Sequence, residues 1–138
     1  MKNILEFLEG FCDELKENNK FEKISFITKY PSILKPVPLT RTIISVGINK
    51  INIGSSHIGE ADEKNAVVQM EVIVCVPFVS NSTKCFSVMQ DVLEYLCFES
   101  SYDVTNCSVG NIKINKETGA YELYGVIDIN TSILRAVV

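Results

Sequence analysis

The stretch Asn65–Phe78, NAVVQMEVIVCVPF, predicts a strand inside a β-sheet. Every second side chain is apolar, which gives one wholly apolar face made of Val68, Met70, Val72, Val74 and Val76. The opposite face begins with Gln69 and Glu71 and becomes apolar at Ile73. A strand that is apolar on one face and half apolar on the other is typical of a central position. We therefore expect the rest of the chain to pack around this strand.

Two helices are predicted to cover the sheet. Residues 3–18 form an amphipathic pattern that Asn3 can cap. Residues 82–98 form a second, with Ser82 as the expected N-cap. The apolar stripe that we expect to face the sheet consists of Cys85, Phe86, Met89, Val92, Leu93, Leu96 and Cys97.

The last third of the chain predicts a β-hairpin around Lys116–Gly119. A four-residue loop with Gly119 left-handed places Ile114 opposite Tyr121 and Ile112 opposite Leu123, with all four side chains toward the core. The same register pairs Lys113 with Glu122 and Gly110 with Gly125. Paired glycines would leave a dent in the sheet, where Phe86 or Met89 could sit.

Together with strands expected at residues 21–30 and 41–53, these elements predict one α+β domain over residues 1–138. We expect a mixed, mainly antiparallel sheet with two helices packed on it, in the order α-β-β-β-α-β-β. The five cysteines form no CxxC pair, and we expect them to be reduced, buried thiols of a cytosolic protein.

Composition and motifs argue against several function classes. The net charge of −4, without a basic cluster, argues against a sequence-specific nucleic-acid-binding protein. No apolar window has the length of a membrane span, and the first residues lack the pattern of a secretory signal. The only histidine, His57, lies near Glu60, Asp62 and Glu63, but this spacing matches no metal motif. We expect no metal, no cofactor and no enzymatic activity.

A proline-rich arm precedes the second expected strand. Residues 31–40, PSILKPVPLT, hold three prolines that favour an extended, polyproline-like conformation. Its apolar side chains need a surface to cover them, either the protein's own core or a neighbouring subunit, and both interpretations stay open. The apolar end of the chain, Val137 and Val138, could likewise extend the last strand or bind another subunit.

The expected element order, the size and the lack of catalytic motifs resemble the tail terminator, or tail completion, proteins of long-tailed phages and phage-tail-like particles. Two stretches, KPVPLTRTIISVGINKINIG at 35–54 and VGNIKINKETGAYELYGVIDI at 109–129, resemble small prophage tail-region proteins of Gram-positive bacteria. The resemblance implies a homo-oligomer, a hexameric ring at the head-proximal end of the tail. Its partners would be the tail tube and sheath proteins and a neck or head-completion protein. The location would be the virion or tail-like particle, assembled in the bacterial cytoplasm.

The family has no catalytic residues to transfer to this chain. The resemblance makes the arm and the chain end candidates for the subunit interface: Ile33, Leu34, Pro36, Val37, Pro38, Leu39, Val137 and Val138. Two alternatives are a neck or head–tail connector protein of the same particle and a small ligand-binding α+β domain with its pocket at the glycine dent.

Overall fold

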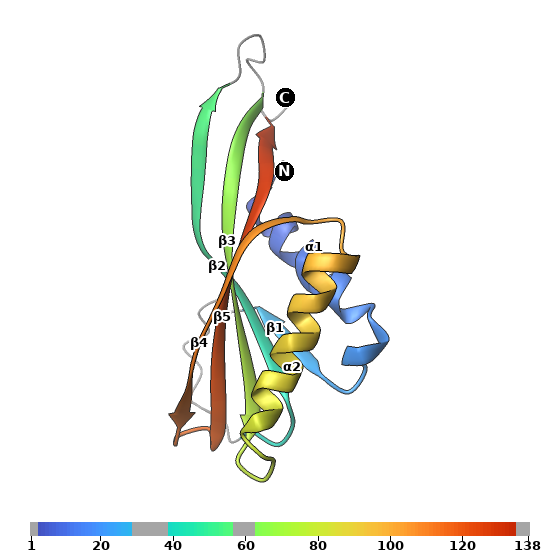
Figure 1. The fold of residues 1–138 in the computed structure, drawn as a ribbon, viewed down its shortest axis with the longest axis vertical. Coiled ribbons are helices and arrows are strands. Elements are labelled where there is room, and N and C mark those ends of the chain that lie inside the picture. Colours follow the sequence, from blue (N-terminus) through green and yellow to red (C-terminus); the bar gives the residue numbers. More distant parts are fainter. Residues whose placement is uncertain (1–2, 29–38, 57–62, 135–138) are drawn as a thin grey trace.

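The computed structural model of the chain describes residues 3–28, 39–56 and 63–134. Figure 1 shows two helices packed on one side of a long, twisted sheet. The helices and their short extensions are α1 (Ile4–Lys16), a 3₁₀ turn η1 (Asn19–Phe21), α2 (Thr83–Glu94) and a π-helical turn η2 (Tyr95–Glu99). The strands are β1 (Ser25–Thr28), β2 (Ile43–Ser56), β3 (Glu63–Pro77), β4 (Asp103–Asn115) and β5 (Ala120–Leu134). The predicted α+β class and element order are confirmed.

The sheet has the strand order β1-β2-β3-β5-β4, so β3 is the central strand, as the alternating pattern predicts. β1 runs parallel to β2, and the other neighbouring strands are antiparallel. β3 pairs with β5 without interruption from Glu63↔Leu134 to Pro77↔Ala120. β2 continues to Ser56, beyond the expected end at Ile53, because Ser56 still pairs with Lys64. The first strand is shorter than expected, since Phe21 belongs to the η1 turn.

The helix starts are fixed by asparagine side chains. Asn3 accepts hydrogen bonds from the backbone N–H groups of Leu5 (2.8 Å) and Glu6 (3.3 Å), which confirms the predicted cap of α1. For α2 the predicted cap was wrong. Ser82 already has helical angles and makes no capping bond, whereas the Asn81 side chain accepts from the N–H of Thr83 at 3.1 Å. The cap therefore lies one residue earlier than the sequence indicated.

The core lies between the sheet and the two helices. From α2 and its extension it takes Cys85, Val88, Met89, Val92 and Leu96. At 100° per residue these five side chains span an arc of about 100°. The predicted burial of Phe86 and Cys97 was wrong: Phe86 is 51% exposed and Cys97 is exposed too. Both lie on the flank of this arc, where α2 faces the outer strand β4 instead of the centre of the sheet.

The hairpin of β4 and β5 is partly as predicted. Ile114↔Tyr121, Lys113↔Glu122 and Ile112↔Leu123 are paired, and Gly119 has the left-handed φ of 66° that the turn requires. The pairing of Gly110 with Gly125 was wrong, because a register shift between Val109 and Ile112 places Val109 opposite Gly125. Ile114 is not in the core either, since it lies on the outermost strand near the turn and is 62% exposed.

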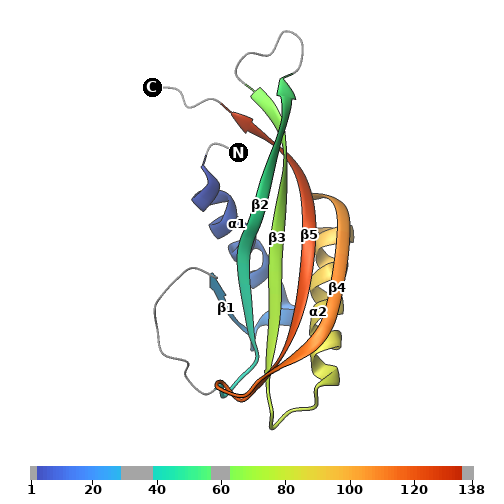
Figure 2. The same ribbon diagram turned by 90° about the vertical axis from the view of Figure 1, so that its left-hand side faces the viewer.

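The face of the sheet away from the helices is the one in view in Figure 2, where both helices lie behind the strands. Its side chains interact across strands. Gln69 donates to Asp128 at 3.1 Å and accepts from Asn49 at 2.7 Å. The Lys113 ammonium lies 4.5 Å from the centre of the Tyr124 ring. This face is therefore stabilised by polar and cation–π contacts, whereas the core side is stabilised by apolar packing.

Candidate subunit interface

Most of the residues predicted for a subunit interface lie outside the described part of the chain: Ile33, Leu34, Pro36, Val37, Pro38, Val137 and Val138. Leu39 is described and is half-buried. Its backbone N–H donates to the carbonyl of Thr118 at 2.7 Å, in the turn between β4 and β5. The last apolar residue of the arm is thus held by its own chain, at the hairpin end of the sheet.

The same end of the sheet is tied to the exit of β3. The N–H of Phe78 donates to the carbonyl of Gly119 at 2.9 Å. The Phe78 and Tyr121 rings pack at 5.0 Å between centroids, although Phe78 remains exposed. These contacts hold the exit of β3 against the turn between β4 and β5.

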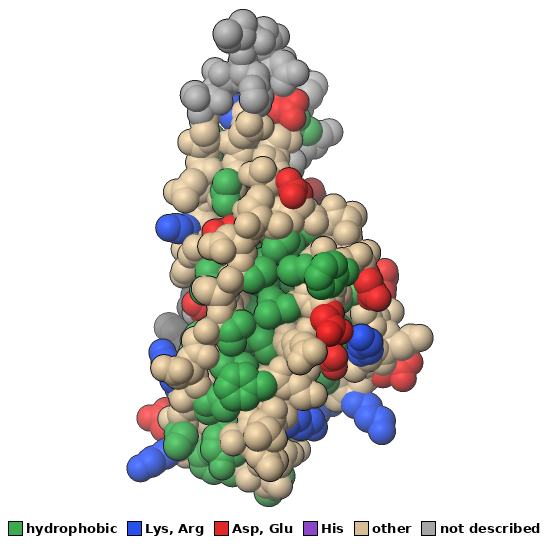
Figure 3. Space-filling model, viewed as in Figure 1, with side chains coloured by type: hydrophobic (Ala, Val, Ile, Leu, Met, Phe, Trp, Pro, Cys, Tyr) green, Lys and Arg blue, Asp and Glu red, His purple; other side chains and the backbone are tan. Residues whose placement is uncertain are grey.

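An apolar groove of about 450 Å³ lies between the helix α2–η2 and the strand β4. Figure 3 shows hydrophobic side chains gathered in a band along this part of the surface. Two exposed phenylalanines, Phe86 and the 84% exposed Phe98, stand on its helical side. The lining residues are Phe86, Met89, Gln90, Leu93, Glu94, Cys97, Phe98, Val109 and Gly110. A contiguous apolar surface with exposed aromatic rings is typical of a site that binds another molecule or subunit.

One glycine lies beneath the Met89 side chain, and another lines the groove. A Cβ atom on Gly125 would lie 2.9 Å from both Cε and Sδ of Met89, so the end of the Met89 side chain would have to shift if Gly125 carried a side chain. The predicted dent is therefore present at Gly125 and is filled by Met89. Gly110 lies in the shifted segment of β4, and a Cβ there would meet only ordinary contact with the Tyr124 carbonyl at 3.7 Å. The floor of the groove is low at this point because Gly110 has no side chain.

The edge of the sheet runs alongside the groove. β4 is an outermost strand, and no described strand pairs with its outer side. An unpaired strand edge offers backbone donors and acceptors to an extended partner chain. The register shifts of β4, at Val104/Asn106 and at Val109/Ile112, interrupt that edge and limit uncontrolled strand addition.

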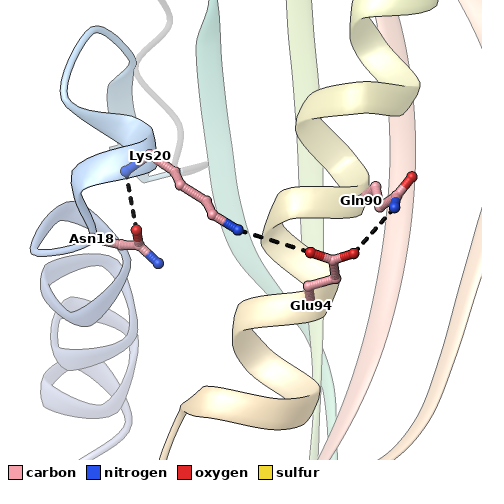
Figure 4. Close-up of polar contacts among 4 residues, drawn as sticks. All are labelled: Asn18, Lys20, Gln90 and Glu94. Atoms are coloured by element: carbon pink, nitrogen blue, oxygen red, sulfur yellow. Dashed lines mark hydrogen bonds and ion pairs between the residues drawn. The ribbon is translucent and has the colours of Figure 1, made fainter.

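The rim of the groove carries a partly exposed ionic contact (Figure 4). The Glu94 carboxylate lies 3.8 Å from the Lys20 ammonium and accepts a hydrogen bond from Gln90 at 3.1 Å. Lys20 is positioned by η1, where its N–H donates to the Asn18 side chain at 3.0 Å. Both charged side chains are about half exposed, so this pair adds little stability but fixes a carboxylate beside the groove.

A second carboxylate joins α1 to the end of α2. The Tyr95 hydroxyl donates to Glu14 at 3.0 Å, and the N–H of Ser101 donates to the same Oε1 atom at 3.4 Å. Burial, together with the neighbouring Glu14 carboxylate, raises the pKa of Tyr95 to about 12. A carboxylate that accepts hydrogen bonds from a tyrosine and from backbone is a structural contact between two elements, because it orders the segment that leads into β4.

Metal and membrane sites were also sought in the described residues. Within 3–28, 39–56 and 63–134, no group of three or more His, Cys, Asp or Glu side chains could hold a metal ion. His57, Glu60 and Asp62, weighed from the sequence as metal ligands, lie outside those ranges. None of the described helices has the length and apolar character needed to cross a membrane.

The groove was only partly visible from the sequence. The glycine dent indicated a depression in the right region, but Phe98 and Val109 were not recognised as part of a surface. Comparison with models of known protein families and with curated proteins found no match.

Proposed function

We propose that this protein is a structural component of a phage tail or phage-tail-like particle, a tail terminator that assembles into a ring. The observation that carries the proposal is the apolar groove between α2–η2 and β4, beside a strand edge with which no described strand pairs. An exposed apolar groove of this kind is expected to be covered permanently by another subunit. The resemblance of residues 35–54 and 109–129 to small prophage tail-region proteins, and of the element order to tail terminator proteins, supports the same function.

The proposed ring needs two different surfaces on each copy. Rings form from head-to-tail contacts, in which a donor surface of one copy fits an acceptor surface of the next. We assign the donor to the proline-rich arm, residues 31–40, and the acceptor to the groove. Grooves lined by aromatic side chains are the usual receptors of polyproline-like segments, and Phe86 and Phe98 supply such rings here. The C-terminal Val137 and Val138 are further candidates for the interface.

Charge favours the same pairing. The arm carries a single charged residue, Lys35, in the middle of its apolar sequence. The groove carries the Glu94 carboxylate at its rim, shared with Lys20 but half exposed. A second cation can therefore approach Glu94, with a contribution of about 1 kcal/mol or less at such an exposed site. The apolar side chains provide affinity, and the charge pair helps to fix the register.

In the particle the ring would be hexameric and would lie at the head-proximal end of the tail. One face would stop the growth of the tube, and of the sheath in a contractile tail. The other face would bind a neck or head-completion protein. The ring would act as a cap and docking surface, without a catalytic step, and would be found in virions or tail-like particles assembled in the bacterial cytoplasm.

The first experiment removes the donor. In the variant Leu34→Asp/Val37→Asp two charges replace apolar side chains of the arm, and the ring should be lost while the fold remains. Analytical ultracentrifugation measures the oligomer and circular dichroism measures the fold. The matched control is Ile4→Asp/Leu5→Asp, which places the same charges on exposed apolar positions of α1 and should leave the ring intact. An intact ring in the arm variant would remove the arm from the interface, and loss of the fold would mean that the arm covers its own core.

A mixing experiment tests the head-to-tail arrangement. Phe98→Asp removes the acceptor and leaves the arm intact. The donor variant and the acceptor variant should each be monomeric alone, whereas their mixture should form a one-to-one dimer and no ring, because only one productive contact remains. Mixtures that stay monomeric, or that regain the full ring, would contradict the assignment of donor and acceptor surfaces.

A second candidate function uses the same groove. A volume of about 450 Å³ with an apolar lining is also within the range of small-molecule pockets, which favours a ligand-binding domain. That function predicts a monomer whose melting temperature rises with an apolar ligand. A neck or connector protein of the same particle would differ from a terminator only in its neighbours, which co-purification with tube protein distinguishes.

A further inference from the structure

Two cysteines from different elements approach each other at one end of the groove. The Sγ atoms of Cys97 and Cys107 are 3.9 Å apart. Cys97 belongs to η2 and is exposed, whereas Cys107 belongs to β4 and is half-buried. Both are free thiols in the structure, and neither is the fully buried thiol that the sequence led us to expect.

The other three cysteines have surroundings that keep them inert. Cys12 and Cys85 are buried in the core, and burial raises the pKa of each thiol. For Cys75, burial and the nearby Glu122 carboxylate raise the pKa to about 12. Since the thiolate is the reactive form of cysteine, Cys97 is the thiol of this chain with the best access to a reagent.

The geometry of the pair permits a covalent bond. A disulfide has an S–S length of about 2.05 Å. The two sulfur atoms, now 3.9 Å apart, would therefore need to move about 1.9 Å closer to each other. Cys97 lies in a π-helical turn at the end of α2, and Cys107 lies on the outermost strand just after a register shift. Neither cysteine lies on a strand that is paired on both of its edges. Their side chains can therefore rotate, and the backbone at each can shift slightly.

We propose that Cys97 and Cys107 are a redox-active dithiol that closes to an intramolecular disulfide, with a low-molecular-weight disulfide such as oxidised glutathione as the oxidant. In the first step the Cys97 thiolate attacks one glutathione sulfur. A bond forms between Cys97 and that glutathione, and the second glutathione leaves as a thiolate that takes up a proton. In the second step Cys107 loses its proton, its sulfur attacks Cys97, and the first glutathione leaves as a thiolate that takes up a proton. Two protein thiols are oxidised, and one disulfide is reduced to two thiols.

The surroundings of Cys107 favour this order of attack. Burial, the adjacent Cys97 sulfur and Asp128 all raise the pKa of Cys107, so it holds its proton while Cys97 reacts. A Cys97 sulfur in a mixed disulfide cannot carry a negative charge, so one cause of the raised pKa of Cys107 is then removed. Cys107 then becomes the resolving thiol.

The disulfide would connect η2 to β4 across the end of the groove. Cys97 lines the groove, so the bond would fix one wall of it relative to the edge strand. Closing the short loop between the two cysteines restricts the unfolded chain, and we expect a rise in melting temperature of about 5 °C or more.

The test uses the full-length protein incubated with oxidised glutathione, followed by mass spectrometry and peptide mapping. Wild type should lose two hydrogen atoms and show a bond between the peptides of Cys97 and Cys107. Cys107→Ser should retain one glutathione on Cys97, because the resolving thiol is missing. Cys97→Ser should react much more slowly. The monomeric variant Leu34→Asp/Val37→Asp is treated in parallel, since a ring could shield Cys97.

The outcomes are distinct. An intramolecular bond between Cys97 and Cys107 in either the wild type or the monomeric variant supports the proposal. Its absence from both samples would overturn it, and so would glutathione retained on wild-type Cys97 or a bond between two chains on non-reducing gels. None of these results depends on whether the protein is a tail terminator, so the proposed function and the dithiol can fail separately.

Discussion

Replacing Gly125 tests the packing of α2 on the sheet most sharply. A Cβ atom at this position would lie 2.9 Å from both Cε and Sδ of Met89. Carbon contacts are optimal at about 3.5–4.0 Å, so the new methyl group would be about 0.6–1.1 Å too close. Met89 is 2% exposed but lines the groove, and Cε and Sδ are the far end of its flexible side chain, so rotation toward the groove relieves part of this overlap. We expect Gly125→Val to lower the free energy of unfolding by about 1–3 kcal/mol, and Gly125→Ala by less.

The assay is chemical denaturation at 25 °C together with a thermal melt. For a chain of this size, 1–3 kcal/mol corresponds to a fall in melting temperature of about 4–10 °C. The matched control is Gly110→Ala, since a Cβ there meets only the Tyr124 carbonyl at 3.7 Å and should change stability by about 0.5 kcal/mol or less.

A double-mutant cycle identifies the colliding partner. Met89→Ala alone leaves a cavity and should cost about 2–5 kcal/mol. The double variant Met89→Ala/Gly125→Val should lose clearly less stability than the two single variants lose together, because the added valine fills the cavity left by Met89. Wild-type stability of Gly125→Val, or strict additivity in the cycle, would refute the packing of Met89 against Gly125.

Three further predictions concern single side chains. Gly10 lies exposed in α1, and nothing lies within 4 Å of an added Cβ. Gly10→Ala should therefore raise the free energy of unfolding by about 0.5–1 kcal/mol. A lower free energy of unfolding in denaturant titration would contradict this. Val72 is fully buried, so Val72→Ala should lower the free energy of unfolding by about 2 kcal/mol. Phe86 is half exposed, so Phe86→Ala should lower it by about 1 kcal/mol or less and mainly weaken assembly. Equal losses of stability in the two variants would refute the assigned face of α2. Tyr95 has a folded-state pKa of about 12 against 10.0 when unfolded, so its contribution is complete below pH 10 and is lost between pH 10 and about 12. Tyr95→Phe should flatten that part of the stability–pH curve, and an unchanged slope would exclude the tyrosine as its source.

The elements that could be predicted from the sequence are those governed by local patterns. The two faces of Asn65–Phe78 identify a central strand because burial on both sides requires apolar residues on both. Near the hairpin turn, alternation and the loop length together determine the pairs from Ile114↔Tyr121 to Ile112↔Leu123. The shift after Val109 could not be predicted, because a bulge changes the register without changing the composition.

The candidate interface depends on strand order, which the periodicity of single elements does not contain. β5 lies between β3 and β4, and this makes β4 an edge strand and leaves the flank of α2 partly uncovered. Phe86 fits the apolar stripe of its helix and was therefore predicted in the core. It is half exposed because that side of α2 faces the groove. Leu39 is the residue of the proposed arm whose contact the structure describes, and that contact is made with its own chain.

Sedimentation velocity of the wild-type protein over a range of concentrations tests the central claim most directly. Each copy has a mass of 15.4 kDa. A hexameric ring predicts a dominant species of six times that mass, with a closed ring visible in negative-stain electron microscopy. Because head-to-tail contacts close on themselves, no larger species should form as the concentration rises. A monomer at every concentration, or an open-ended series of growing polymers, would contradict the proposed ring.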